Sequence, residues 1–505
     1  MDTKRIAKNT LFLYIRMLLV MFVSLFTSRV LLNALGETDY GLNNVLAGLI
    51  VVFSFINGSL SAATSRYLTY SLGQEDKSEV EKTFSISLMI HGCLALVVVL
   101  LGGVIGGYIV NEVMNIPPER QYACNIVFVT VIISSVLSII QVPFNALIIS
   151  NEKMGVYAYV GITEAVSKCL IAYLVMVYGG DKLIMLSILQ LLLVAILFVF
   201  YVSYCRRVFR VKMKLVGFAE KKLCKEMLGY SSWSMIGSGA NMLKTQGVNL
   251  LINIFFGSVV NAANAVAYNV NAAVISFSNN FTMAINPQII KSYASGKIEE
   301  MKSLMFLGGK LTFFMLMFLC LPIIFETRQI LDIWLVKVPE YAVVFTRLVL
   351  VLTMVESFTY TIGYAIQATG KIKYYQIVIS GLTLMNFPVS LLLYWLGMPP
   401  YTALFVSVCI STTTLMMRLY FIKVLLKISP IEYFKKVFVR VFVTLSISLP
   451  LPYMVYLNME EGLVRMCVVF LTIIITNVIM IWLFGRPSVE RGKVKGLIEK
   501  KIRKC

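Results

Sequence analysis

The sequence predicts an all-α, polytopic membrane protein, and three observations carry this prediction. Hydrophobic residues make up 59% of the 505 residues and charged residues only 14%, whereas soluble domains carry about 25% charged residues. About fourteen apolar runs follow one another along the chain, each near the roughly 20 residues that a helix needs to cross a bilayer. Lysine and arginine concentrate in every second connection between these runs.

The apolar runs define the expected spans. Their approximate bounds are 9–33, 42–65, 84–110, 122–148, 156–178, 183–205, 230–256, 262–290, 305–325, 342–367, 377–397, 402–422, 437–457 and 463–484. The first run has no small-residue cleavage site after it, so we interpret it as a span and not as a signal peptide.

The distribution of basic residues predicts an orientation. If the N-terminus starts in the cytoplasm, 32 of the 45 Lys and Arg fall in inner segments and 5 in outer loops, with the rest inside spans. Inner loops of membrane proteins are rich in Lys and Arg. We therefore expect both termini in the cytoplasm and an even number of spans. The same rule explains the net charge of +20, so no nucleic-acid partner is expected.

Cofactor and metal chemistry find no support in the sequence. The nine cysteines form no CxxC pair, and His91 is the only histidine. Metal sites and disulfide frameworks depend on clusters of such residues at short spacings. We expect no cofactor, no metal site and no catalytic residues.

A basic segment at 206–229 separates two groups of spans. It carries eight Lys or Arg among apolar residues at helical spacing, which is typical of an amphipathic helix on the membrane surface. The predicted organisation is a six-helix bundle at 1–205, this linker, a second six-helix bundle at 230–422, two additional helices at 423–484 and a basic tail at 485–505.

The two bundles resemble each other in sequence. Aligning the segments near residues 31 and 251 brings Asn33 onto Asn253 and Gly36 onto Gly257. Because each bundle has an even number of spans, both copies run in the same direction through the membrane. Such parallel repeats are a transporter design with the binding site between the halves.

Polar residues inside the spans are the candidate site residues, since burying them in a bilayer is costly. Spans one, two, seven and eight are the most polar. The amides that we expect to line a hydrophilic cleft are Asn57, Asn241, Asn249, Asn271 and Asn279. The alternative is that such side chains serve as hydrogen bonds between helices, which suits single Ser and Thr positions better than whole polar stripes.

Charged residues within the spans divide into three groups. Near the inner ends, Lys310, Arg418 and Arg440 are expected to reach the interface with their long side chains. Glu164 and Lys168 are four residues apart, which favours an ion pair on one helix. Glu356 either binds a cation or proton or pairs with a lysine on another span, and the sequence leaves both open.

The opening segment KNTLFLYIRMLLVMFVSLFTSRVLLNALGETDYGLNNVLAG resembles bacterial polysaccharide flippases of the Wzx type. These belong to the multidrug/oligosaccharidyl-lipid/polysaccharide exporter superfamily. The resemblance extends over the whole length and implies a V-shaped, MATE-like pair of six-helix bundles whose first, second, seventh and eighth helices line the cleft. It also implies that the membrane is the bacterial cytoplasmic (inner) membrane, and that polyprenyl-pyrophosphate-linked oligosaccharide repeat units are translocated across it for O-antigen (lipopolysaccharide) or capsule assembly.

A cationic cleft suits that anionic substrate, because Arg and Lys bind phosphate well. We expect Arg16, Arg29, Lys244 and Arg347 to form the anion-binding set, with Glu356 and Glu164 as candidates for coupling to Na⁺ or H⁺. Membrane lipids and the polysaccharide polymerase or assembly machinery are the other expected partners. Competing interpretations are a multidrug extrusion antiporter, a flippase for the peptidoglycan lipid precursor and, more distantly, a membrane-integral polysaccharide polymerase.

Overall fold

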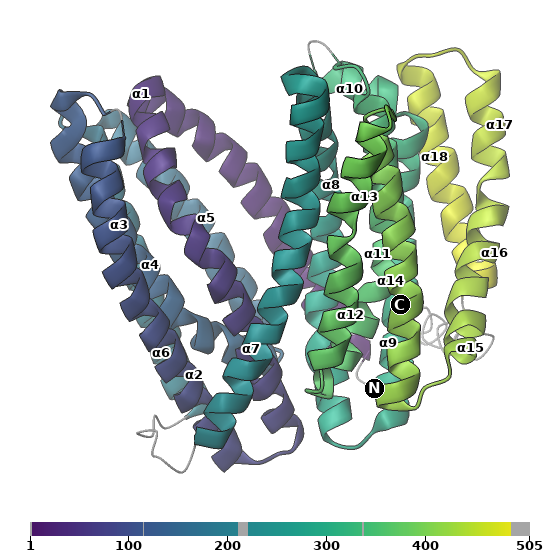
Figure 1. Cartoon of the computed structure of the whole chain (residues 1–505), viewed down its shortest axis with the longest axis horizontal. Coiled ribbons are helices and arrows are strands. Elements are labelled where there is room, and N and C mark those ends of the chain that lie inside the picture. Colours follow the sequence, from purple (N-terminus) through teal and green to yellow (C-terminus); the bar gives the residue numbers. More distant parts are fainter. Residues whose placement is uncertain (1–2, 115, 211–220, 336–337, 486–505) are drawn as a thin grey trace, which may run out of the picture. The chain divides into compact units, whose positions relative to one another are not determined.

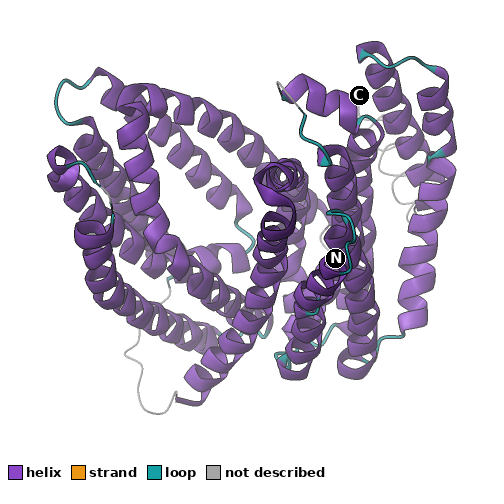
Figure 2. Ribbon diagram, turned by 45° about the horizontal axis from the view of Figure 1, so that its top comes forward, coloured by secondary structure: helices purple, strands orange, loops and turns teal. Residues whose placement is uncertain are grey.

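The computed structural model describes residues 3–114, 116–210, 221–335 and 338–485, and these ranges contain helices and no strand (Figures 1 and 2). Ten helical segments in them are long and apolar enough to cross a membrane. They coincide with ten of the predicted spans, from 84–110 to 183–205 and from 305–325 to 463–484. The protein is therefore a polytopic helical membrane protein, as predicted.

The other four predicted runs lie in three helices around two glycines. These helices are α1 (Thr3–Gly73), α7 (Lys221–Met242) and α8 (Val248–Ala294). Gly36 divides α1 into two helical arms, and Gly257 divides α8 in the same way. The arms lie where the sequence predicts spans one, two, seven and eight, and the total of about fourteen spans stays a prediction.

The two dividing glycines have nearly the same backbone conformation. Gly36 has φ 74° and ψ 172°, and Gly257 has φ 80° and ψ −178°. This region of φ and ψ is essentially open to glycine alone. The alignment that pairs Gly36 with Gly257 therefore pairs two positions that turn the chain in the same way.

The described chain forms two compact units. The first unit contains the residues up to Ser238 together with Ile290–Lys297, and the second contains Gly239–Ile289 and the residues from Ile298 on. Both α7 and α8 thus contribute residues to each unit. The predicted domain boundaries at 205 and 230 stay a prediction, and the tail at 486–505 and residues 211–220 of the linker lie outside the described residues.

In the first unit, α1 packs against α4 and α5, and α4 packs against α2 and α6 (Figure 1). The bounds of these helices are α2 Lys77–Val97, α3 Gly103–Tyr108, α4 Gln121–Ser150, α5 Met154–Val177 and α6 Lys182–Phe209. Polar contacts support this packing, because lipid gives little hydrophobic drive for helices to associate. Thr69 Oγ1 of α1 donates to Ser150 Oγ of α4 at 2.7 Å, and both side chains are buried.

In the second unit, α11 is the central helix and packs against α9 and α14. The helix bounds are α9 Ile298–Phe325, α10 Thr327–Trp334, α11 Ala342–Ala368, α12 Lys373–Leu384, α13 Asn386–Trp395 and α14 Thr402–Leu426. Two glycines on α9 permit the close approach. A Cβ on Gly308 would lie 2.6 Å from Thr361 Cγ2, and one on Gly309 would lie 2.7 Å from the Tyr433 hydroxyl.

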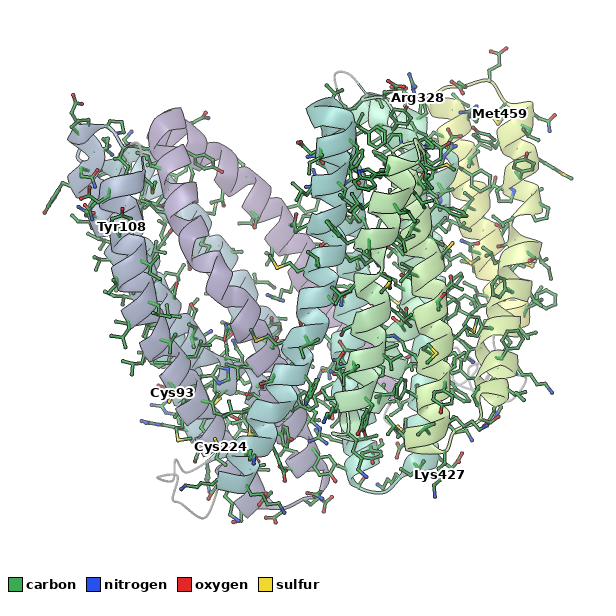
Figure 3. All side chains as sticks on the ribbon, in the orientation of Figure 1. Cys93, Tyr108, Cys224, Arg328, Lys427 and Met459 are labelled. Carbon is green, nitrogen blue, oxygen red and sulfur yellow. The ribbon has the colours of Figure 1, made fainter. Side chains whose placement is uncertain are left out.

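The last helices belong to the second unit and pack along α9 (Figure 1). They are α15 Pro430–Tyr433, α16 Val439–Ser448, α17 Pro450–Asn458 and α18 Leu463–Met480. A π-helical turn at Phe434–Phe438 joins α15 to α16. Figure 3 shows Arg328 and Met459 at one end of this unit and Lys427 at the other.

We predict that Gly36→Ala and Gly257→Ala each lower the free energy of unfolding by about 1–3 kcal/mol, because a Cβ forces strain at these φ and ψ values. An added Cβ meets no atom within 4 Å at either position, so the loss would report backbone strain alone. Thermal unfolding of the purified protein in detergent measures it.

Gly58→Ala is the matched control, since Gly58 lies in α1 with ordinary helical backbone and also has open space around its Cβ position. Equal stability of the Gly36 and Gly58 variants would contradict the prediction.

Candidate functional site

The second unit holds a buried ion pair between two predicted site residues. Lys244 Nζ lies 2.6 Å from Glu356 Oε1, and the Lys244 side chain is only 8% exposed. Ser411 Oγ donates to the same carboxylate oxygen at 3.1 Å and lies 3.3 Å from the ammonium. Lys244 and Glu356, which we assigned to different roles, therefore form one charge-compensated cluster with α14.

The pair depends on a local irregularity in the backbone. Lys244 lies in a π-helical turn, Leu243–Gly247, between α7 and α8. Such turns are rare and occur frequently at functional sites. Because Glu356 lies mid-way along α11, the ammonium and the carboxylate meet only through the tertiary packing of this unit. Of the two alternatives for Glu356, the geometry corresponds to pairing with a lysine on another span.

Some of the predicted amides of the second unit form hydrogen bonds within the unit, whereas others are exposed, so neither of the two alternatives holds for all of them. Asn264 Nδ2 donates to Asn249 Oδ1 at 3.3 Å, and Thr353 Oγ1 donates to Asn271 Oδ1 at 2.6 Å. These contacts join helical arms within the unit, as interhelical hydrogen bonds do. Asn241 and Asn279 are exposed within the structure.

Arg347 caps a helix. Its Nε donates to the carbonyl of Ile324 at 3.0 Å, and Nη2 reaches the carbonyl of Phe325 at 3.5 Å. The last carbonyls of a helix lack partners within the helix and carry partial negative charge. Arg347 on α11 thus satisfies carbonyls at the end of α9, and its assignment to the anion-binding set stays a prediction.

Arg16 differs from the other predicted cations in its hydrogen bonding. Its guanidinium lies over the Tyr157 ring at 4.4 Å from the centroid. A Cβ on Gly161 would come within 2.1 Å of Nε, so this glycine of α5 makes the room for the arginine. Nε is buried and has no hydrogen-bond partner, and no ion pair involves Arg16 in the described part of the chain.

The remaining predicted residues of the first unit give less information. The side chain of Arg29 lies outside the described residues. Asn57 Oδ1 is buried without a hydrogen-bond partner among them. Glu164 and Lys168 form the expected pair, with Lys168 Nζ 2.6 Å from Glu164 Oε1, and both side chains are exposed within the structure.

Sequence reasoning missed one buried cation. Arg66 is 7% exposed, and its guanidinium lies 4.5 and 4.8 Å from the ring centroids of Tyr67 and Tyr70. A third ring, Tyr230 of α7, lies at 5.8 Å. We had counted Arg66 with an inner loop, whereas it belongs to α1. The local sequence RYLTY places both tyrosines next to the arginine, but Tyr230 is far away in the chain.

Basic residues in the predicted outer loops are neutralised by carboxylates. Arg120 Nη1 lies 2.8 Å from Asp181 Oδ2, and its Nε donates to Asp39 Oδ1 at 2.9 Å. Burial by itself would raise the pKa of Asp181, but the backbone amides at the start of α6 and the Arg120 guanidinium lower it on balance. Arg465 makes a two-pronged pair with Glu326, which is 1% exposed, at 2.9 and 3.0 Å.

The comparisons with known proteins agree with this architecture. A family model described as polysaccharide biosynthesis protein matches residues 6–293, which is more than half of the chain. The chain belongs to the polysaccharide biosynthesis protein family. No curated protein sequence matches it.

Solved structures of MATE transporters share the fold of this family member. A crystal structure of MATE in complex with MaD3S has a TM-score of 0.69 at 13% identity, covering 84% of this chain and 97% of that one. An outward-facing multidrug resistance MATE transporter of the MOP superfamily has a TM-score of 0.66 at 12% identity, covering 82% and 95%.

A third structure comes from Pyrococcus furiosus, with a TM-score of 0.67 at 12% identity and coverage of 82% and 94%. It is described as a MOP superfamily transporter whose binding pocket of reversed polarity suggests a different function. The chain is therefore a member of the polysaccharide biosynthesis protein family with the fold of these MATE and MOP superfamily structures.

We predict that Glu356→Gln lowers the free energy of unfolding by about 3 kcal/mol. Removing one partner of a buried ion pair leaves an uncompensated charge and costs about 3–5 kcal/mol, and the partial exposure of Glu356 places the loss at the low end. The double variant Lys244→Met/Glu356→Gln should recover to within about 1 kcal/mol of wild type, because both charges are gone.

Unfolding in detergent measures both variants, and Asp332→Asn is the control because it breaks an exposed pair with Arg328, in a predicted outer loop, that is worth less than about 1 kcal/mol. A double variant no more stable than Glu356→Gln would contradict the pairing as the source of stability.

We also predict that Arg347→Met lowers stability by about 1.5–3 kcal/mol, the usual contribution of a hydrogen bond to a charged group. Affinity for substrate should stay at the wild-type value, since the guanidinium serves the end of α9. Arg328→Met, which removes a largely exposed arginine, should change neither quantity. Loss of affinity without loss of stability would return Arg347 to the substrate site.

Proposed function

We propose that this protein is a transporter, specifically a flippase that moves polyprenyl-pyrophosphate-linked oligosaccharide repeat units from the inner to the outer leaflet of a bacterial cytoplasmic membrane, by alternating access. Membership of the polysaccharide biosynthesis family is the observation that carries this proposal. The substrate contains a pyrophosphate, which needs cationic donors, and a glycan, which needs adaptable hydrogen bonds from amides and hydroxyls.

The hydrogen bonding of the three predicted cations whose side chains are described supports Arg16 as the pyrophosphate ligand. Lys244 is compensated by Glu356 and Arg347 caps α9, while the donors of Arg16 have no acceptor among the described residues. Arginine presents planar donors that match a phosphate, and stacking on Tyr157 holds the guanidinium in place. Within the same unit, Asn57 is a candidate for contacts to sugar hydroxyls, because its Oδ1 is buried without a hydrogen-bond partner among the described residues.

The Lys244–Glu356 pair is the candidate for coupling to an ion gradient. A proton or Na⁺ that binds Glu356 would release the lysine, and a released lysine can bind an anion. The charge of the cluster thus changes while the Glu356 carboxylate keeps a partner, either Lys244 or the bound cation. In this proposal Lys244 joins the anion-binding set only in the ion-bound state.

The same proposal includes the absence of enzymatic activity and an orientation with both termini in the cytoplasm. The orientation rests on the excess of Lys and Arg in alternate loops. The pairing of Arg120 and Arg465 with carboxylates supports it, since two of the five basic residues in the predicted outer loops are thereby neutralised.

A multidrug antiporter is the second candidate, because MATE transporters share the fold. Sites for cationic drugs need an unpaired carboxylate, and Glu356 is paired with Lys244. The Pyrococcus furiosus structure is described with a pocket of reversed polarity, so this fold accommodates pockets of different charge. The balance of charged groups favours the anionic substrate.

The test is reconstitution of the full chain in liposomes that carry a lipid-linked oligosaccharide. Wild-type protein should expose the glycan to an external lectin much faster than empty liposomes do. A fluorescent cationic drug, imposed ion gradients and the peptidoglycan lipid precursor form the parallel arms. Movement of the drug but not of the oligosaccharide lipid would overturn the proposal.

We predict that Arg16→Gln lowers the rate of oligosaccharide-lipid translocation by about 10- to 100-fold, equivalent to losing a hydrogen bond to a charged group of about 1.5–3 kcal/mol. Arg16→Lys should retain an intermediate rate, since it keeps the charge but not the planar fork. Lys168→Gln is the control, because it removes a positive charge from a predicted span of the same unit. Equal rates for Arg16→Gln and Lys168→Gln would exclude Arg16 as a ligand.

A further inference from the structure

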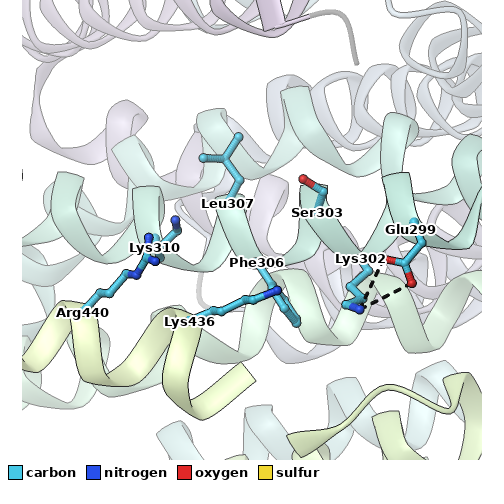
Figure 4. A pocket seen from close by; sticks show the side chains of 8 residues that line it. All are labelled: Glu299, Lys302, Ser303, Phe306, Leu307, Lys310, Lys436 and Arg440. Carbon is cyan, nitrogen blue, oxygen red and sulfur yellow. Dashed lines mark hydrogen bonds and ion pairs between the residues drawn. The ribbon is translucent and has the colours of Figure 1, made fainter. Parts of the chain in front are cut away.

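A basic pocket lies in the second unit at the end where α9 begins. Its lining includes neither Lys244 nor Glu356. It has a volume of about 310 Å³ and is lined from α9 and from the segment that leads into α16 (Figure 4). The lining residues are Glu299, Lys302, Ser303, Phe306, Leu307, Lys310, Lys436 and Arg440. We call it the α9–α16 pocket.

Helical spacing explains why the cations converge. Lys302, Phe306 and Lys310 are four residues apart on α9 and lie on one face, and Lys436 and Arg440 have the same spacing on the facing segment. Lys436 Nζ lies 6.0 Å from the centroid of the Phe306 ring. Figure 4 shows the Lys310 and Arg440 side chains extending toward each other.

Basic side chains outnumber the carboxylates around the α9–α16 pocket. Four of the lining side chains are basic and only Glu299 is acidic. Glu432 lies beside the lining and pairs with Lys436 at 2.6 Å and with Lys302 at 3.0 Å. Among the described residues, two carboxylates therefore face four cations, and Arg440 makes no ion pair.

The surroundings of the α9–α16 pocket are apolar and exposed. Ile431, Phe434, Val439 and Phe442 flank the cations on α15 and α16, and each is more than 40% exposed. In a protein that spans a membrane, such side chains face acyl chains. A ligand with a negative headgroup and apolar tails satisfies both surfaces, whereas a free phosphate ion satisfies only the cations.

We propose that the α9–α16 pocket binds the phosphodiester headgroup of an anionic phospholipid. Basic pockets between transmembrane helices on the cytoplasmic side bind acidic lipid headgroups in this way, and the charge count places the start of α9 on that side. The site uses residues that were expected only to extend toward the interface. The lipid headgroup would contact both α9 and α16. It would therefore help to hold the last helices against α9, a packing that no sequence pattern explains.

Native mass spectrometry of the full chain tests the proposal with phosphatidylglycerol and phosphatidylcholine of identical acyl chains. Wild type should retain phosphatidylglycerol preferentially. Lys310→Gln/Arg440→Gln should weaken its retention by about fivefold for each charge removed. Lys310→Arg/Arg440→Lys should behave as wild type. Arg440→Gln alone serves if the double variant fails to fold, because Arg440 is partly exposed.

Lys371→Gln/Lys423→Gln is the matched control, since both lysines are exposed in the same unit and neither lines the pocket. Equal retention of the two lipids, or an equal loss in this control, would overturn the proposal. Displacement of the lipid by glycerol phosphate at the same concentration would assign the site to a free phosphate. Displacement by a short-chain polyprenyl pyrophosphate, but not by excess phosphatidylglycerol, would assign it to the transported substrate.

Discussion

Ion pairs between partly or fully buried side chains that are distant in the sequence organise both units of the protein. The cost of an unpaired ion in a low-dielectric interior is several kcal/mol, comparable with the whole stability of a domain. Lys244 meets Glu356, Arg465 meets Glu326, and Arg120 bridges two aspartates. Each pair joins helices that are distant in the sequence, so charge neutralisation also selects which helices become neighbours.

The same need for charge neutralisation separates structural cations from candidate ligands. A guanidinium that already donates to the end of a helix, as Arg347 does through Nε and Nη2 at the end of α9, has fewer donors left for a substrate. Arg16 is held by an aromatic ring and by the space that Gly161 provides, and its buried Nε lacks an acceptor. Packing without hydrogen bonding is what a binding residue requires, because its donors stay available until the anion arrives.

Charge compensation also gives the second unit two different basic sites. The Lys244–Glu356 cluster is balanced and buried, so it responds to any ligand that changes the charge of either partner. The α9–α16 pocket places more basic than acidic side chains beside exposed apolar surface. In the functions proposed above, the first site changes its charge during transport and the second holds a lipid.

The sequence by itself determined the helical class, the position of ten spans and the glycines at which α1 and α8 turn. These features depend on the local composition and on the φ and ψ values that single residues allow, so the local sequence indicates them. It also identified Lys244, Glu356 and Arg347 as unusual, because charge is rare in apolar runs. Only the tertiary structure decided what each one contacts. Pairing, helix capping and the ring cluster around Arg66 depend on side chains that are far apart in the sequence, such as Arg66 and Tyr230, which are 164 residues apart. One-dimensional periodicity carries no information about such contacts.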